Sequence, residues 1–177
     1  MSRFKTLTWF KNLNLTTSKN RKHQKITILN SISFIPNNKL VQLLYSFYIR
    51  EKITMNKDSA LDYINTHNLT EIKAGSHRTT FLEIWMVTVN DRIFARSWGL
   101  AEKSWYHTFL EDPEGQIRCG EETFNIKALV PDDLKELTSE INRAYLTKYN
   151  TGPNLKYSKG IIEQKHVEKT MEFIICE

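Results

Sequence analysis

The clearest pattern of hydrophobic and polar positions lies between residues 81 and 97. Phe81–Val89 is rich in residues that favour β-strands, and Asn90-Asp91 is predicted to form a two-residue turn before a returning strand, Arg92–Ser97. A two-residue loop fixes the register of such a hairpin. It should place three pairs opposite one another: Val89 and Arg92, Val87 and Phe94, and Trp85 and Arg96. We expect the last pair to form a cation–π contact.

The other face of this hairpin carries smaller side chains, which suit the interior of a small barrel. They are Ile84, Met86, Thr88, Ile93, Ala95 and Ser97. Four further strands are predicted at Leu69–Ala74, Gln116–Cys119, Glu122–Val130 and Lys169–Ile175. Few connections look like parallel crossovers, so the pattern predicts an α+β domain built on a mostly antiparallel barrel of about six strands.

Three helices are predicted beside these strands. The first spans about 58–68, because Asp58 or Ser59 can cap its start. The second is Glu102–Glu111, which has a broad apolar face. The third opens at Pro131 and buries a stripe made of Leu134, Leu137, Ile141 and Tyr145.

The end of the third helix and the segment after it need no functional interpretation. Lys148 lies in the last turn of that helix, where the helix dipole alone explains a cation. Thr151–Lys159 follows it and contains Gly152 and Pro153, which stop helices. We therefore predict a loop there.

Charge is distributed unevenly along the chain. Residues 1–54 hold ten Lys or Arg and a single acid, Glu51, whereas residues 55–177 hold 15 basic and 19 acidic residues. An asymmetry of this size marks a tail or a boundary. We expect residues 1–54 to be a basic extension, mostly without fixed structure apart from a short amphipathic helix at 39–49. Residues 55–177 should form the folded domain.

Three interpretations of residues 1–54 compete. The segment resembles a mitochondrial presequence in being basic and poor in acids. It would also serve as a basic arm for nucleic acid or an anionic membrane. The third interpretation, which we favour, is that it is not part of the native protein, because Met55 directly precedes a predicted helix start. In that case the domain carries a net charge of −4, which argues against nucleic acid as a partner.

Cysteine and histidine usage points to an ordinary cytoplasmic protein. Cys119 and Cys176 match no metal spacing and no redox motif, and without a clear secretory signal they fit a reducing compartment. The five histidines show no helical ligand spacing, so we expect no metal site. The sequence contains no run of 18 apolar residues, so we expect no membrane-spanning helix.

The candidate chemistry follows the predicted hairpin. The returning strand ends in Arg96-Ser97, a loop with Gly99 follows, and a helix begins near Lys103. Backbone N–H groups at that helix start, together with Arg96 and Lys103, would hold an anion such as a phosphate. The chain contains neither a nucleophile elbow nor a phosphate-cradling glycine loop, so no motif indicates a particular reaction.

Two tryptophans frame this segment. Trp98 and Trp105 would flank a planar ring, which makes Trp105 a candidate cofactor contact. The alternative is that Trp105 belongs to the core, Arg96 is a surface cation over the ring of Trp85, and Lys103 is solvated. The residues alone leave both interpretations open.

Five short motifs occur in a characteristic order along the chain. They are Ile84–Val87, Phe94–Trp98, Lys103–Tyr106, Ala144–Tyr149 and Glu168–Phe173. As a set they resemble the bacterial family called domain of unknown function 2255, over roughly residues 69–175. That family looks related to the split-barrel proteins that bind flavin, especially the deazaflavin-dependent nitroreductases. The resemblance implies a small, mostly antiparallel split β-barrel of about six strands with two or three flanking helices.

The resemblance also implies a site. In the split-barrel flavin proteins the cofactor phosphate lies near the end of the strand and the loop after it. This role carries over to Arg96, Ser97 and Lys103, with Arg78 as a weaker candidate. The loop departs from the pattern, because it holds only Gly99 between two bulky residues where the relatives are more open.

Three hypotheses of function follow. The first is a split-barrel domain that binds flavin mononucleotide (FMN) or a deazaflavin as a nitroreductase-like oxidoreductase, paired as a homodimer with the cofactor at the interface. The second is a non-enzymatic module of the same fold that binds a small ligand or a protein. The third, nucleic-acid binding, depends only on residues 1–54.

Overall fold

A computed structural model describes residues 39–99, 101 and 103–176 of the chain. The chain divides into two compact units, residues 1–47 and 48–177. The described part of the first unit is the start of helix α2, and the strands and other described helices belong to the second. The expectation for residues 1–54 falls mostly outside the described residues, and the boundary at residue 55 stays a prediction.

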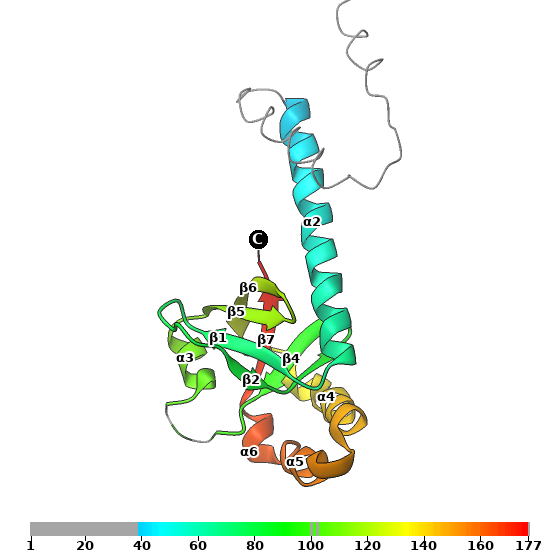
Figure 1. The fold of residues 1–177 in the computed structure, drawn as a ribbon, viewed down its shortest axis with the longest axis vertical. Helices are drawn as coiled ribbons and strands as arrows, with labels where there is room; N and C mark the ends of the chain where they lie inside the picture. The colour runs from blue at the N-terminus through cyan, green and yellow to red at the C-terminus, as the bar shows by residue number, and fades with distance from the viewer. Residues whose placement is uncertain (1–38, 100, 102, 177) are drawn as a thin grey trace, which may run out of the picture. The chain divides into compact units, whose positions relative to one another are not determined.

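Helix α2 spans Lys39–Thr66 without a break (Figure 1). We predicted a short helix ending near Ile49 and a separate one beginning at Asp58 or Ser59, and this prediction is wrong. The segment contains neither Gly nor Pro, so no residue in it interrupts a helical backbone. Instead of capping a helix, the Ser59 hydroxyl donates to the Glu122 carboxylate at 2.6 Å.

Seven strands form one antiparallel sheet in the order β2-β1-β5-β6-β7-β4-β3. Their bounds are β1 Thr70–Ala74, β2 Leu82–Ile84, β3 Met86–Val89, β4 Arg92–Arg96, β5 Glu114–Cys119, β6 Glu122–Leu129 and β7 Thr170–Ile175. Strands β2 and β3 lie at the two edges of this order, yet only Trp85 separates them along the chain, so the sheet curls into a nearly closed barrel (Figure 1). The predicted α+β barrel with flanking helices is confirmed, with one strand more than expected.

The extra strand arises because Trp85 interrupts the predicted strand Phe81–Val89. The Trp85 ring stacks on the ring of Tyr149, with centroids 4.1 Å apart and planes 4° from parallel. The Tyr149 hydroxyl accepts from the Met86 N–H at 3.1 Å and donates to the Met86 carbonyl at 2.9 Å. Tyr149 therefore holds the chain at the point where it passes from one edge of the sheet to the other.

The hairpin of β3 and β4 has the predicted register. Val89 pairs with Arg92 and Val87 pairs with Phe94. Asn90 and Asp91 both adopt positive φ angles, 51° and 56°, as a two-residue type I′ turn requires. The third predicted pair, Trp85 with Arg96, does not form, because β3 begins one residue after Trp85.

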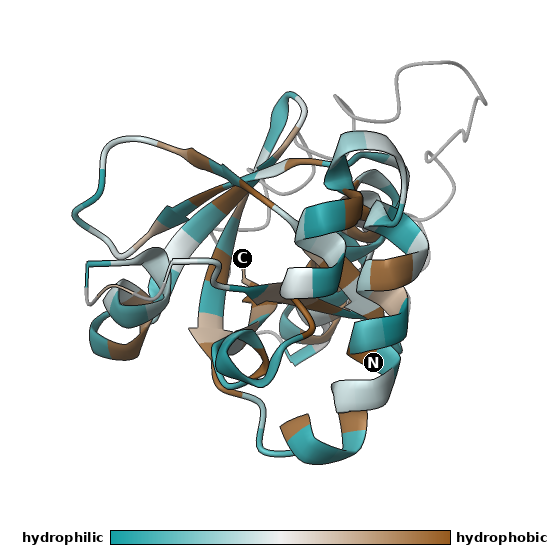
Figure 2. Ribbon diagram, turned by 90° about the horizontal axis from the view of Figure 1, so that it is seen from below, coloured by the Kyte–Doolittle hydropathy of each residue, from teal (hydrophilic) through white to brown (hydrophobic). Residues whose placement is uncertain are grey.

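Two apolar clusters of described residues form the core. The larger fills the barrel and includes four of the six positions predicted for the interior: Ile84, Met86, Ile93 and Ala95. The smaller joins the outer face of β3 and β4 to helix α4, and it contains Val87, Val89, Phe94, Leu137, Ile141, Tyr145, Tyr149 and Ile161. Hydrophobic and hydrophilic residues alternate accordingly along the strands and divide the helices into faces (Figure 2).

The helices differ from the predicted ones mainly at their starts. Helix α3 is Trp105–Glu111 rather than a helix from Glu102, because Ser104 has extended backbone and caps it. Helix α4 is Leu134–Tyr149, and it begins three residues after Pro131. Its predicted stripe is buried except for Leu134, which is half-buried, and Tyr149 extends the stripe.

The predicted loop after α4 is wrong. This region contains the 3₁₀ helix η2, Gly152–Asn154, followed by α5, Leu155–Gly160, and α6, Gln164–Val167. Pro153 occupies an early position of η2, where its fixed φ and missing N–H are tolerated. The same residue types that end one helix therefore begin the next.

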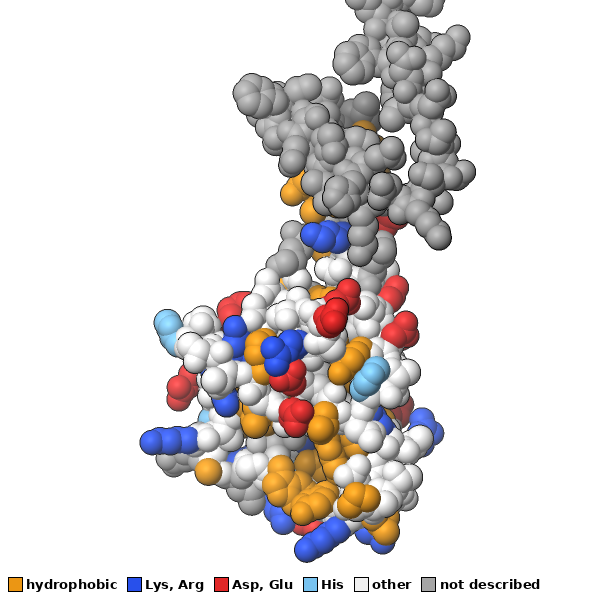
Figure 3. All heavy atoms as spheres, viewed as in Figure 1, with side chains coloured by type: hydrophobic (Ala, Val, Ile, Leu, Met, Phe, Trp, Pro, Cys, Tyr) orange, Lys and Arg blue, Asp and Glu red, His pale blue; other side chains and the backbone are white. Residues whose placement is uncertain are grey.

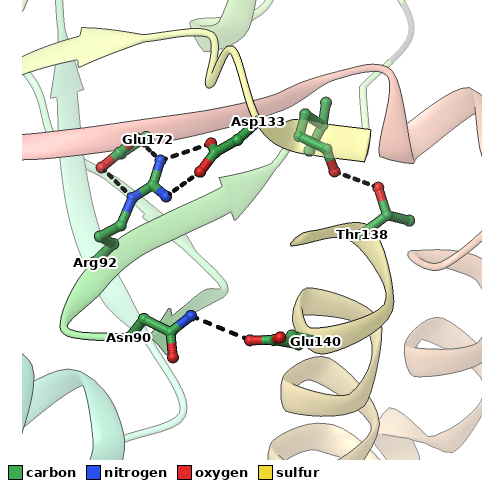
Figure 4. Close-up of polar contacts among 7 residues, drawn as sticks. Asn90, Arg92, Asp133, Thr138, Glu140 and Glu172 are labelled. Carbon is green, nitrogen blue, oxygen red and sulfur yellow. Dashed lines mark hydrogen bonds and ion pairs between the residues drawn. The ribbon is translucent and has the colours of Figure 1, made fainter. Parts of the chain in front are cut away.

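A polar cluster ties the barrel to the start of α4 (Figure 4). The Arg92 guanidinium donates twice to the Glu172 carboxylate, at 2.8 and 2.6 Å, and twice to the Asp133 carboxylate, at 2.7 and 3.0 Å. Asn90 donates to Glu140 at 3.2 Å. Asp133 is the residue just before α4, and its carboxylate binds Arg92 of β4.

Candidate functional site

A cleft of about 630 Å³ opens where β4 ends. The structure brings all five residues predicted for the site to its lining: Arg78, Arg96, Ser97, Lys103 and Trp105. They come from the segment before β2, from the end of β4 and from the start of α3. A common location is a geometric finding, and binding by these residues stays a prediction.

Arg96 is the most unusual member of the cleft. Its side chain is only 3% exposed, and its guanidinium donates to Thr170 Oγ1 at 3.1 Å, to Asn142 Oδ1 at 2.6 Å and to the Ile161 carbonyl at 3.2 Å. All three acceptors are neutral. The second terminal nitrogen, Nη2, is buried and has no hydrogen-bond partner among the described residues.

The charge of Arg96 is not balanced by any described carboxylate, since the ion pairs of the described chain involve other residues. Burial therefore lowers the pKa of Arg96 from its ordinary value, and the nearby Tyr145 only partly opposes this. A buried cation without a counter-charge costs stability, so it needs an explanation beyond folding.

Arg96 does not stack on Trp85, so both the predicted cation–π pair and the interpretation of Arg96 as a surface cation are wrong. Its guanidinium lies over the ring of Tyr145, 5.4 Å from the centroid. The Tyr145 hydroxyl accepts from the backbone N–H of Arg96 at 2.9 Å. The physical reason is that α4 covers the outer face of β4 and buries the side chains there.

Ser97 and the loop after it are held from two sides. Ser97 is fully buried, its N–H donates to the Lys169 carbonyl at 3.1 Å, and its hydroxyl donates to the Gly99 carbonyl at 3.0 Å. The carbonyl of Ser97 accepts from Nδ1 of the buried His166 at 2.9 Å, which fixes the proton of that ring on Nδ1. The hydroxyl predicted to bind a phosphate is therefore already engaged with the loop.

The remaining predicted residues differ in burial. Lys103 is exposed, and Arg78 is half-buried and donates from Nε to the Thr80 carbonyl at 3.0 Å. At the start of α3 the N–H of His107 donates to the hydroxyl of Ser104, which caps the helix, and the N–H of Thr108 donates to the Ser104 carbonyl in the first bond of the helix. Binding of an anion at this helix start stays a prediction.

Trp105 belongs to the barrel core, as the alternative interpretation predicted. It is 6% exposed and packs near Phe109 and Phe173, with ring centroids 6.3 and 6.1 Å away. Part of it nevertheless lines the cleft. Trp105 is therefore a fixed part of the cleft wall, held by its packing in the core.

The described walls of the cleft are mostly apolar, with a positive balance. The apolar lining residues are Leu69, Leu82, Ile84, Trp85, Trp98, Trp105, Tyr157 and Ile161. The described lining contains three cations, Arg78, Arg96 and Lys103, and one acid, Glu83. Figure 3 shows hydrophobic side chains gathered at the end of the barrel domain where α5 lies. The chemistry of the cleft favours a ligand with an apolar body and an anionic group.

Sequence reasoning missed that Lys148 is half-buried. Its ammonium donates to the carbonyl of Ile64, in the last turn of α2, and to the carbonyl of Met86 at 2.7 Å. Burial lowers the pKa of Lys148 to about 8. Its spacing of three residues from Tyr145 and seven from Ile141 places it next to the buried stripe of α4, and this was the available signal.

The described residues show neither a metal-binding cluster nor a membrane-spanning helix. Among these residues there is no group of three or more His, Cys, Asp or Glu side chains that could hold a metal ion. None of the helices in the described part of the chain combines the length and the apolar character needed to cross a bilayer.

The chain belongs to the family described as an uncharacterized protein conserved in bacteria (DUF2255), whose model matches residues 60–173. This range contains the whole barrel except the end of β7, and all the residues of the cleft. The family identified from the sequence motifs is thereby confirmed. No curated protein matches the chain.

Among solved structures, the chain is similar to a conserved hypothetical protein of Mycobacterium tuberculosis. The two share 15% sequence identity, and the match covers 66% of this chain and 78% of that chain with a TM-score of 0.43.

Proposed function

We propose that the cleft binds a small ligand that joins a flat aromatic ring to an anionic group, with FMN or a deazaflavin as the ligand class. The observation that carries the proposal is the buried, unbalanced guanidinium of Arg96 in the cleft wall. An anion in the cleft would supply the counter-charge that the described residues do not. The resemblance to split-barrel flavin proteins points to the same strand end.

The cleft fits a ligand of this kind in size and lining. Its volume of about 630 Å³ falls within the range of about 300 to 1,000 Å³ typical of small-molecule sites. Trp85, Trp98 and Trp105 offer aromatic surface for a ring, and Arg96 offers a charge for a phosphate or carboxylate. Lys103 and Arg78 add positive potential near the same ligand.

The residues of the chain would bind and orient the ligand. A bound flavin or deazaflavin would itself supply the electron-transfer chemistry. The buried walls formed by Trp105 and Ile84 would exclude water from one side of the ring, since both side chains are less than a tenth exposed. Arg96 would fix the anionic end, because its guanidinium is already held by three acceptors and loses little freedom on binding.

A second candidate is a non-enzymatic module that binds an aromatic anion without a redox role. One observation favours it: the Ser97 hydroxyl, predicted to bind phosphate, is bonded to the Gly99 carbonyl. In this version the anion contacts Arg96 alone. The two candidates share the cleft and differ in whether the bound ligand is reduced and reoxidised.

The first test is an absorbance spectrum of the purified full-length chain, followed by titration with FMN and with a deazaflavin. We expect either a co-purified chromophore or micromolar binding of at least one compound. Binding accompanied by reduction with a nicotinamide donor supports the oxidoreductase, and binding without reduction supports the non-enzymatic module. A colourless protein that binds neither compound contradicts the proposal.

The residue that carries the proposal can be tested directly. Changing Arg96 to Gln keeps a polar side chain that can still donate to Thr170 or Asn142, but removes the charge. We expect at least a tenfold loss of affinity for FMN, about 1.4 kcal/mol. Lys127→Gln, which removes an exposed charge outside the cleft lining, is the matched control and should bind normally.

A further inference from the structure

Resting on the proposed function, we infer that Trp98 is the stacking platform of the site and selects ligands by their flat ring, independently of the anionic group. Trp98 lines the cleft and is 47% exposed, the highest exposure among the three tryptophans there. An exposed tryptophan in a mostly apolar cleft has aromatic surface that the protein itself does not use.

One face of the Trp98 ring is already occupied. It stacks on the buried imidazole of His166, with centroids 4.7 Å apart and planes 10° from parallel. It also meets the ring of Tyr157 in a T-shaped arrangement, with centroids 5.6 Å apart and planes at 72°. Trp98 is still nearly half exposed, so part of its aromatic surface remains for a ligand.

Gly160 shows that the position of Trp98 is specified by close packing. A Cβ atom built on Gly160 would lie 2.6 Å from Cη2 of Trp98, a distance that real contacts do not reach. The backbone of Gly160 does not need a positive φ, so the close approach of the ring is the reason for a glycine here.

The support under Trp98 is itself anchored. His166 is 2% exposed, and its Nδ1 donates to the Ser97 carbonyl, one residue before Trp98. The imidazole therefore holds both the ring and the backbone of the same loop. A ring fixed in this way before binding loses little conformational entropy when a ligand stacks on it.

The inference separates two parts of the ligand. Trp98 would recognise the planar ring, whereas Arg96 would recognise the anion. Riboflavin and FMN form a matched pair of probes, because they share the ring and differ by the phosphate. Trp98 should therefore matter equally for both probes, and Arg96 should matter for FMN alone.

The experiment measures the affinity of the full-length chain for riboflavin and FMN in native, Trp98→Leu and Arg96→Gln forms. Stacking of a planar base on an aromatic side chain contributes enough to expect a loss of about tenfold on its removal. We expect Trp98→Leu to weaken the binding of both probes by that same factor, and Arg96→Gln to weaken the binding of FMN only. The control is Phe81→Leu, which removes an aromatic side chain outside the cleft lining and should leave the binding of both probes unchanged.

Gly160→Ala provides a second variant that keeps Trp98 but displaces its ring, and it should weaken both probes as Trp98→Leu does. Circular dichroism confirms that each variant is folded before binding is measured. Native binding that survives undiminished in Trp98→Leu and Gly160→Ala overturns the inference while the proposed function stands. Native protein that binds neither probe nor a deazaflavin overturns both.

Discussion

Two arginines on one strand show how differently a charge can be accommodated. Arg92 bonds two carboxylates, Asp133 and Glu172, which raise the pKa of its guanidinium further above the ordinary value. Arg96, four residues later and on the same face, has only neutral acceptors among the described residues, and its Nη2 has no hydrogen-bond partner there. Folding explains the first residue and leaves the second unexplained, so a ligand anion is the natural complement of Arg96.

The sequence could predict which residues meet at the cleft, but not how they are buried. The alternation of the strand correctly placed Arg96 on the outer face of the barrel. It could not show that α4 covers this face, because that depends on packing between segments about 46 residues apart in the chain, as the bond to Asn142 illustrates. The same limit applies to Lys148, whose half-buried position depends on α2 and β3.

Lys148 gives a prediction at the residue scale. Lys148→Met would leave the carbonyls of Ile64 and Met86 without this donor, and we expect it to lower the free energy of unfolding by about 1 to 3 kcal/mol. Urea denaturation of both proteins measures the difference. Thr147→Val, at the exposed neighbouring position, is the control and should change stability little.

The effect of Lys148 should also depend on pH. Burial lowers the pKa of folded Lys148 to about 8, below the ordinary 10.5 of the unfolded chain, so the folded protein releases this proton first as the pH rises. The unfolded state then holds more protons between about pH 8 and 10.5, and the native protein gains stability relative to Lys148→Met in that window. A stability difference that stays constant or shrinks there would show that the two carbonyls keep the ammonium charged.

At the scale of elements, the prediction succeeded where local chemistry leaves little freedom. A two-residue turn fixes the register of its strands, and the β3–β4 hairpin has the pairing expected from Asn90-Asp91. Helix starts were predicted less well, because Ser59 and Asp58 have the chemistry of a cap but lie within a continuous α2. The break at Trp85 depends on Tyr149, which is distant in sequence.

The β3–β4 turn offers a test of this explanation. Asp91 has a φ of 56°, a conformation that glycine adopts without steric cost, and it is exposed. Asp91→Gly should raise the free energy of unfolding by about 0.5 to 1 kcal/mol, and Asp91→Ala should lower it. Thermal unfolding of the two variants beside the native protein measures both signs. Equal effects of Gly and Ala would mean that the turn is not under the constraint described.

At the scale of the whole molecule, the described apolar core lies in the second unit. Every member of the two apolar clusters of described residues lies between Ala60 and Ile175. The family match covers residues 60–173, within the same unit. The two edge strands of the described sheet are joined through Trp85, so the barrel is formed by strands of the second unit.

We therefore expect residues 48–177 to fold alone and to unfold at about the same temperature as the full chain, within a few degrees. Differential scanning calorimetry of the two proteins checks this. The shorter protein should also bind the ligand of the full chain with equal affinity, because the described cleft residues all lie after residue 68. A large fall in the unfolding temperature would show that residues 1–47 contribute to the fold.

The measurement that tests the central claim most directly is a crystal structure of the full-length chain grown with FMN or with the deazaflavin that binds most tightly. The account predicts the anionic group of the ligand within about 2.7 to 3.2 Å of the Arg96 guanidinium, with its ring in the cleft beside Trp98. A ligand bound elsewhere, or an anionic group that does not contact Arg96, would contradict the account and leave the buried charge of this residue without a role.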